Sequence, residues 1–305
     1  MMHKLIVKTI TPLHIGGNEQ LALNLDYIVS NQHVAILNRD ELVKYLAKNK
    51  VFNFNKNYSY QDVGNIVKSH AEKLPDTAIS RKLSMSDGFK EYLGQHRIEG
   101  KMHIGEFIND GRNYYLPASS VKGAMLTGLG LKELGINSES PRLKDRFIMT
   151  DSDPIPARFF VILRTVEGRP PINIVCIKQN VEIELLIKRT GLLDIDSTIT
   201  SCSEYSKEQL MRALEYLRVS KSSKSPFKIG GIENFEEALS SIREYPIKTG
   251  EFLMNIGFGG GGWFKVTKGI NPTDKGKSPE TSFEFDISGN MTHIGWCVCR
   301  FEEVN

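Results

Sequence analysis

A run of glycines near the end of the chain restricts its fold more than any other feature. Residues 255–265 read Asn-Ile-Gly-Phe-Gly-Gly-Gly-Gly-Trp-Phe-Lys, and five of these eleven residues are glycine. Glycine loses more backbone entropy on folding than any other residue, so a folded protein keeps such a run where bare backbone must approach another group closely. Successive backbone N–H groups bind anions such as phosphate. Apolar residues on both sides argue against a loose surface turn, and the run predicts an anion-binding loop.

Two known cofactor loops do not fit this run. The spacing Gly257-x-Gly259-x-x-Gly262 matches a dinucleotide fingerprint, but that fingerprint opens a helix inside a βαβ unit. Here residues 263–268 are expected to be extended. A Walker A loop requires Gly-Lys-Ser/Thr after its glycines, and the sequence has Trp263 and Phe264 instead. We therefore expect no nucleotide cofactor and no other cofactor.

A second glycine-containing loop lies near the start of the chain. Residues 3–10 read as a strand that runs into Thr-Pro-Leu-His-Ile-Gly-Gly at 11–17, where Pro12 ends the strand and Gly16 and Gly17 turn the chain. His14 could act as a general base or acid in RNA cleavage. The favoured alternative is a histidine that packs or contacts phosphate, because no partner histidine or lysine follows at an informative spacing.

The third feature is the start of a helix after residue 116. Ser119 or Ser120 is expected to cap this helix, whose apolar residues fall on one face. Lys122 places a cation in the first turn, where the helix dipole is already positive. A lysine there is either a solvated surface residue or a partner of the free N–H groups in binding an anion.

The sequence gives little support for a metal site or for contact with a membrane. The cysteines at 176, 202, 297 and 299 form no Cys-x-x-Cys pair, so neither a zinc site nor a disulfide framework is expected. Asp151 and Asp153 could hold a metal, but Asp before Pro154 more often marks a turn. No apolar run is long enough to span a bilayer, and we expect a cytoplasmic protein without membrane contact. The net charge of +3 permits a nucleic-acid partner without requiring one.

The element pattern predicts an α+β fold. Strand–helix–strand patterns occur in each half without the rhythm of a doubly wound sheet, which favours two small modules. We place an N-terminal module at residues 1–156, with an insertion at about 50–110 where no firm period is found, and a C-terminal module with the glycine-rich loop at residues 157–305. The predicted elements include a hairpin at 27–37, followed by a helix capped by Asn38.

The motifs together resemble a known family. They are 11–17, Asp26-Tyr27, Leu-Pro-Ala-Ser-Ser-Val-Lys-Gly-Ala at 116–124, and the glycine run up to Trp263. In this order they resemble the RAMP superfamily of type III CRISPR effector proteins, and most of all the fifth subunit of the Csm (type III-A) complex. Two positions depart from the family pattern, because Ala118 replaces a glycine and Leu126 stands where relatives often have arginine.

The resemblance implies two ferredoxin-like, RRM-type modules and a non-catalytic RNA-binding subunit. That subunit would cap the 3′ end region of the guide RNA (crRNA), and take part in crRNA maturation and antiviral defence. Its partners would be crRNA, target RNA, a backbone RAMP subunit and host ribonucleases. Two alternatives stay open: a metal-independent endoribonuclease that processes precursor crRNA through His14, and a RAMP subunit of a Cmr-type complex. The expected RNA-binding residues are His14, Gly16, Gly17, Ser119, Ser120, Lys122, Gly123, Gly257, Phe258, Gly259, Gly260, Gly261, Gly262, Trp263 and Lys265.

Overall fold

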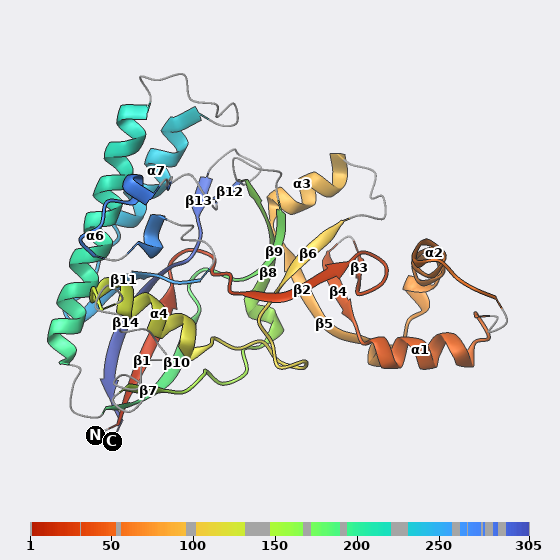
Figure 1. Cartoon of the computed structure of the whole chain (residues 1–305). Helices are drawn as coiled ribbons and strands as arrows, with labels where there is room; N and C mark the ends of the chain where they lie inside the picture. The colour runs from red at the N-terminus through yellow and green to blue at the C-terminus, as the bar shows by residue number, and fades with distance from the viewer. Residues whose placement is uncertain are drawn as a thin grey trace.

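The protein is built on two β-sheets, as a computed structural model of the chain shows (Figure 1). The first, here called the terminal sheet, has five strands whose neighbours are all antiparallel. Their order is β11 (Glu251–Asn255), β14 (Trp296–Glu303), β1 (Met2–Thr9), β10 (Glu182–Arg189) and β7 (Phe147–Met149). The first and last strands of the chain are neighbours in this sheet, so the two termini lie together. The structure describes residues 2–30, 32–52, 56–95, 102–131, 147–166, 172–189, 194–220, 231–257, 263–266, 268–275, 277, 283–285 and 291–304.

The second sheet, here called the curled sheet, occupies the middle of the molecule (Figure 1). Its order is β2 (Gly16–Ala22), β6 (His103–Phe107), β9 (Ile172–Ile177), β8 (Phe160–Val166), β5 (Ile79–Met85), β4 (His33–Leu37) and β3 (Tyr27–Val29), and the hairpin of β12 (Phe283–Phe285) and β13 (Met291–His293) adds to β8. Two of its pairings, β5 with β8 and β6 with β9, are parallel.

Within the described residues, three helices accompany the terminal sheet and three the curled sheet (Figure 1). The first three are α4 (Ala118–Gly128), α6 (Ile195–Ser220) and α7 (Gly231–Arg243). The others are α3 (Asp87–Gln95), whose Phe89 is fully buried, and the pair α1 (Arg39–Lys48) and α2 (Tyr60–His70), which projects from one end. Short 3-10 turns lie at Ala71–Lys73, Asp76–Ala78, Ala157–Phe159, Trp263–Lys265 and Pro272–Lys275.

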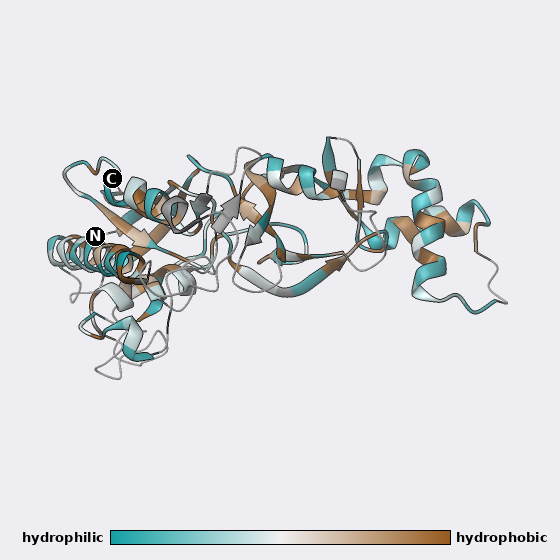
Figure 2. Cartoon of the chain, turned by 90° about the horizontal axis from the view of Figure 1, so that it is seen from above, coloured by the Kyte–Doolittle hydropathy of each residue, from teal (hydrophilic) through white to brown (hydrophobic). Residues whose placement is uncertain are grey.

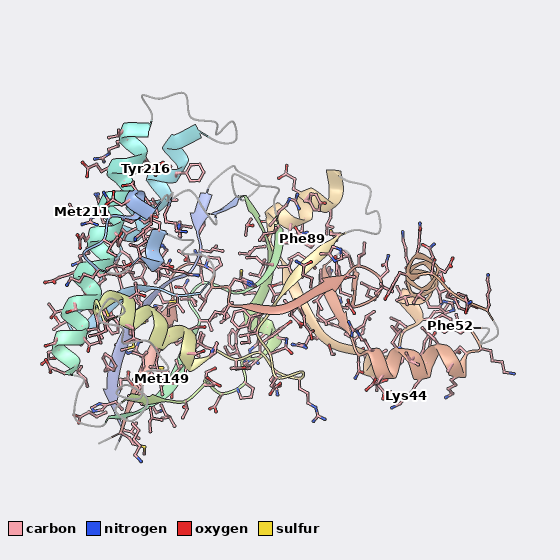
Figure 3. The ribbon with its side chains drawn as sticks, viewed as in Figure 1. Lys44, Phe52, Phe89, Met149, Met211 and Tyr216 are labelled. Atoms are coloured by element: carbon pink, nitrogen blue, oxygen red, sulfur yellow. The ribbon has the colours of Figure 1, made fainter. Side chains whose placement is uncertain are left out.

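The buried residues recur with the period of the strand or helix that contains them. In β1, Leu5 and Val7 are fully buried and belong to one apolar core that extends through both sheets. A second core under α6 and α7 contains Trp263 and Trp296. Met211, on the opposite face of α6, is 61% exposed and points away from the protein (Figure 3). In the view from above, apolar residues concentrate along the central strands and the outer helix faces are largely hydrophilic (Figure 2).

The sequence predicts the caps of two helices, and the structure confirms one of these predictions. Asn38 caps α1 as predicted, because its side chain accepts a hydrogen bond from the backbone N–H of Glu41. The predicted caps of α4 are wrong. That helix begins at Ala118, directly after Pro117, whose ring fixes its own φ angle. Ser119 and Ser120 therefore lie inside the first turn of the helix.

The α+β class is confirmed, whereas the two ferredoxin-like modules and the boundary at residue 156 stay predictions. Both sheets take strands from either side of that boundary. The segment 50–110, expected to be an insertion, supplies β5 and β6 to the interior of the curled sheet. The predicted hairpin is confirmed, since β3 and β4 pair antiparallel.

Within the described ranges, no helix is both long and apolar enough to cross a membrane. The four cysteines are buried thiols. No cluster of metal-ligating side chains is found in this part of the chain either.

Candidate nucleic-acid interface

The three predicted loops meet at one groove of about 380 Å³. We call it the clamp groove and define it by the predicted site residues that line it: Gly16, Ser119, Ser120, Gly123, Gly257 and Lys265. These residues come from β2, from α4, from the segment that follows β11 and from the 3-10 turn after the glycine run. Segments more than 100 residues apart in the sequence are therefore brought to one surface.

Residues 10–16 connect the two sheets and are held on both sides by backbone hydrogen bonds. Leu13 and Ile177 exchange two N–H···O=C bonds of 3.0 and 2.8 Å. The N–H of Gly295 donates to the carbonyl of Pro12 at 2.7 Å, and the N–H of Ile108 donates to that of Ile15 at 2.9 Å. Four hydrogen bonds to three residues, each in a different region of the chain, thus fix this loop. The position of Gly16 in the groove wall follows from them.

Gly257 packs directly against this loop. A Cβ atom at position 257 would lie 2.3 Å from the backbone oxygen of His14 and 3.0 Å from Cγ1 of Ile15. Its φ of +79° also lies in the left-handed region, which side chains disfavour. Only glycine fits here, so the start of the glycine run is fixed by the first loop.

Helix α4 turns one face toward the groove. Ser119, Ser120, Gly123, Ala124 and Thr127 line it, in the i, i+4 spacing of a single helix face. The first N–H groups of a helix have no acceptor within it.

Two first-turn amides of α4 are already bonded: the Ala118 N–H donates to Oδ1 of Asp151 at 2.7 Å, and the Ser120 N–H donates to the carbonyl of Pro117 at 3.1 Å. For the Ser119 N–H no acceptor is recorded among the described residues. The serine hydroxyls add further donors at this helix end.

His14 lies beneath the groove rather than on its surface. The residue is 4% exposed, its Nδ1–H donates to the carbonyl of Val175 at 2.7 Å, and its ring meets the edge of Phe107. Burial lowers the pKa of His14 to about 4, although the bond to Val175 opposes this shift. The imidazole is therefore neutral at neutral pH, and it supports the loop from behind.

The remaining predicted residues fall into three groups. Gly17 lines a neighbouring, larger groove, and Lys122 is half-buried in the first turns of α4 but does not line the clamp groove. Trp263 is 1% exposed and donates from Nε1 to the carbonyl of Gln209 at 3.2 Å, so its ring belongs to the core and is closed to a stacking base. Phe258 and residues 259–262 lie outside the described residues.

The clamp groove is mildly cationic. Lys265 is exposed at its rim, and no carboxylate lines it in the described part of the chain. One lysine, hydroxyls and backbone N–H groups suit a phosphate or a phosphate chain. Such contacts hold a nucleic-acid backbone without distinguishing its bases.

Some lining residues were missed from the sequence. Ile15, Ala124, Thr127, Asn255 and Phe264 also form the wall. Thr127 and Ala124 follow from helical spacing once Ser120 and Gly123 are chosen, so a signal existed for them. Asn255 ends a strand, and only the tertiary fold brings it here.

Comparisons with known proteins agree on one family and one fold. A model of the RAMP superfamily matches residues 6–265. A chain of a type III-A CRISPR–Cas Csm–crRNA–target RNA ternary complex, solved by cryo-electron microscopy, is 16% identical with a TM-score of 0.63, covering 99% of this chain and 100% of that one. The crystal structure of Csm5 from T. onnurineus is 18% identical with a TM-score of 0.60, covering 96% and 99%. No curated protein matches the chain. At these identities, the two structures show a shared fold.

Proposed function

Because the chain belongs to the RAMP superfamily, we propose that it is a non-catalytic RNA-binding subunit of a type III-A CRISPR effector complex of the Csm kind. The observation that carries this proposal is the convergence of three N–H-presenting segments on the clamp groove, which no carboxylate lines among the described residues. The fold shared with a chain of a Csm–crRNA–target RNA complex and with Csm5 supports the same assignment over a Cmr-type complex.

The proposal extends to the position and partners expected from the family. The subunit would hold the 3′ end region of crRNA, contribute to crRNA maturation and antiviral defence, and act in the cytoplasm. It would contact target RNA, a backbone RAMP subunit and host ribonucleases. We also infer two ferredoxin-like modules. The antiparallel order of β11, β14, β1 and β10, with α4 and α6 packed beside it, supports one of them.

Salt-dependent binding of single-stranded RNA by the full chain tests RNA binding at this groove. For a single strand, the logarithm of the binding constant falls linearly with the logarithm of the salt concentration. Each phosphate contact adds about 0.7 to the steepness of that fall. Lys265→Ala is expected to weaken binding and reduce that slope by about 0.7. The matched control is Lys44→Ala, an exposed lysine on the projecting helix α1 (Figure 3), which should leave the slope unchanged. No binding by the wild-type chain, or equal effects of the two variants, would reject the proposal.

The endoribonuclease alternative gains no support from the position of His14. A general base must reach the proton it removes, and this imidazole is buried with Nδ1 committed to Val175. Incubation of the chain with precursor RNA in the absence of metal is expected to leave the RNA intact. Cleavage that disappears in His14→Ala would favour the alternative.

A further inference from the structure

Among the described residues that line the clamp groove, Asn255 has the only amide side chain. It is the last residue of β11, where its backbone pairs with Trp296 of β14. The residue is half-buried, and its Nδ2 donates to the carbonyl of Ile294 at 3.4 Å. Because a carbonyl only accepts, the nitrogen of the amide must face Ile294 and the oxygen must point elsewhere. The contact with Ile294 therefore sets which way the amide is turned.

Gly295 makes room for this amide. Its φ of +93° lies in the left-handed region, and its N–H donates to the carbonyl of Pro12 at 2.7 Å. A Cβ atom at position 295 would lie 3.2 Å from Nδ2 of Asn255 and 2.8 Å from the carbonyl oxygen of Ile256. The Asn255 side chain thus rests on bare backbone that the loop at residues 10–16 holds in place. A side chain fixed in this way loses little further freedom when it binds a ligand.

The side-chain oxygen of Asn255 is an acceptor that the described residues leave unused. For Oδ1 no donor is recorded among them, and the atom is not buried. Thr127 differs, because its hydroxyl already donates to the carbonyl of Gly123 at 2.8 Å. The hydroxyls of Ser119 and Ser120 can either donate or accept, whereas an amide oxygen can only accept. Oδ1 of Asn255 therefore calls for a donor on the ligand.

The other polar groups of the clamp groove call for acceptors. The ammonium group of Lys265 and the backbone N–H of Ser119 can only donate. Phosphate oxygens satisfy such donors, and phosphates are the same in RNA and in DNA. The 2′-hydroxyl is the one hydrogen-bond donor of the sugar–phosphate backbone inside a strand, and DNA lacks it. An acceptor placed among phosphate-binding donors therefore matches RNA.

We propose that Oδ1 of Asn255 accepts a hydrogen bond from a 2′-hydroxyl of the bound strand, and that this contact makes the clamp groove select RNA over single-stranded DNA. The inference rests on the proposed function, because a strand must lie in the groove for its sugar to be read. Asn255 is then a specificity-determining residue, and Lys265 and the N-terminus of α4 supply the phosphate contacts. The sequence of bases plays no part in this selection.

Three oligomers of uracil nucleotides, equal in length, separate the sugar contact from the phosphate contacts. They contain ribose, 2′-deoxyribose or 2′-fluororibose, and their binding to the full chain is measured by fluorescence anisotropy. The fluorine keeps the pucker of ribose but has no proton to donate, so the third oligomer tests the hydrogen bond itself. Wild-type protein is expected to bind the RNA about five-fold more tightly than either analogue, which is the effect of one ordinary hydrogen bond.

Two variants then assign the preference to a residue. Asn255→Ala is expected to weaken RNA binding about five-fold and to leave DNA binding unchanged, so that the ratio of the two affinities falls close to one. Lys265→Ala is the control, expected to weaken all three oligomers by the same factor and to keep the ratio. An Asn255→Ala protein that loses RNA and DNA affinity equally would show a merely structural role and would overturn the assignment.

The outcomes separate this inference from the proposal beneath it. In the wild-type protein, RNA binding no tighter than binding of the deoxy or the fluoro oligomer would overturn sugar selection by a hydrogen bond while RNA binding stands. This comparison needs no substitution, so it holds even where Asn255→Ala does not fold. A preference for RNA that survives in Asn255→Ala would overturn the role of that residue. Failure of all three oligomers to bind would overturn the proposed function and this inference together.

Discussion

Gly257 is the residue on which the contact between two of the three loops depends. Its φ is +79°, and any Cβ there would overlap the His14 carbonyl oxygen. The glycine-rich composition predicted a close approach of backbone, but that it is the backbone at His14 could not be foreseen from sequence. Because Gly257 has no side chain, the backbone at His14 can pack against it. The clamp groove is a result of that packing.

We expect Gly257→Ala to destabilise the fold. The left-handed backbone alone costs on the order of 1–3 kcal/mol in a residue with a side chain, and the clash adds to it. Urea unfolding measures the change. Gly123→Ala is the matched control, because no atom lies within 4 Å of its added Cβ and alanine favours a helix interior by about 0.5–1 kcal/mol. Similar losses in both variants would contradict the assigned packing.

The buried histidines give the second expectation at this scale, a dependence of stability on pH. Burial lowers the pKa values of His14 and His293 to about 4, below the usual 6.5. The unfolded chain therefore binds more protons than the folded one, and stability is fully present above pH 6.5 and is lost as the pH falls toward 4. Each histidine is expected to remove on the order of 3 kcal/mol across that window.

Urea unfolding at pH 7 and pH 5 measures this loss. His14→Gln should remove part of the decline, whereas His33→Gln, at the start of β4 where its ring contacts Ser30 in an exposed position, should leave it in place. A free energy of unfolding that stays constant between the two pH values would show that the buried imidazoles are not the cause.

At the scale of elements, helix α4 depends on a segment distant in sequence. Asp151 accepts from the Ala118 N–H at 2.7 Å, and the Ser152 hydroxyl accepts from the Leu116 N–H at 2.9 Å. From sequence, Asp151 and Asp153 are candidate metal ligands, with a turn as the favoured alternative. In the structure these side chains hold the start of α4 and so position Ser119 and Ser120 at the clamp groove.

Asp151→Ala is expected to lower the free energy of unfolding by about 1 kcal/mol, the usual cost of losing a helix cap. RNA affinity should fall as well, because the N-terminus of α4 loses its anchor. Asp153→Ala is the control, since its carboxylate makes no recorded hydrogen bond among the described residues. Equal effects of the two substitutions on unfolding would contradict the anchoring role.

Elements with clear local signals were the predictable ones. The cap at Asn38 and the hairpin of β3 and β4 have such signals in the residues themselves. Strand β5 was missed because Ser80 and Arg81 line the larger groove of about 1020 Å³ beside the clamp groove, and these polar residues interrupt the apolar alternation before Leu83. A strand that contributes side chains to a polar groove has no clean period of two.

At the scale of the whole molecule, pairing between distant strands decides the architecture. β1 lies between β10 and β14, so Leu5 has Leu185 on one side and Phe301 on the other. The alternation of apolar residues identifies each of these segments as a strand. It does not indicate which strands pair when they lie nearly 300 residues apart in the sequence. The composition of the two sheets therefore came only from the structure, as did the meeting of the three loops.

The central claim is that these loops form one surface for a single RNA strand. Ultraviolet crosslinking of the full chain to single-stranded RNA, followed by mass spectrometry of the modified peptides, tests it most directly. We expect crosslinks on peptides that contain Gly16, Ser119 to Gly123, and Lys265, from the same short RNA. Crosslinks confined to the projecting helices α1 and α2, with none on these three segments, would contradict the account.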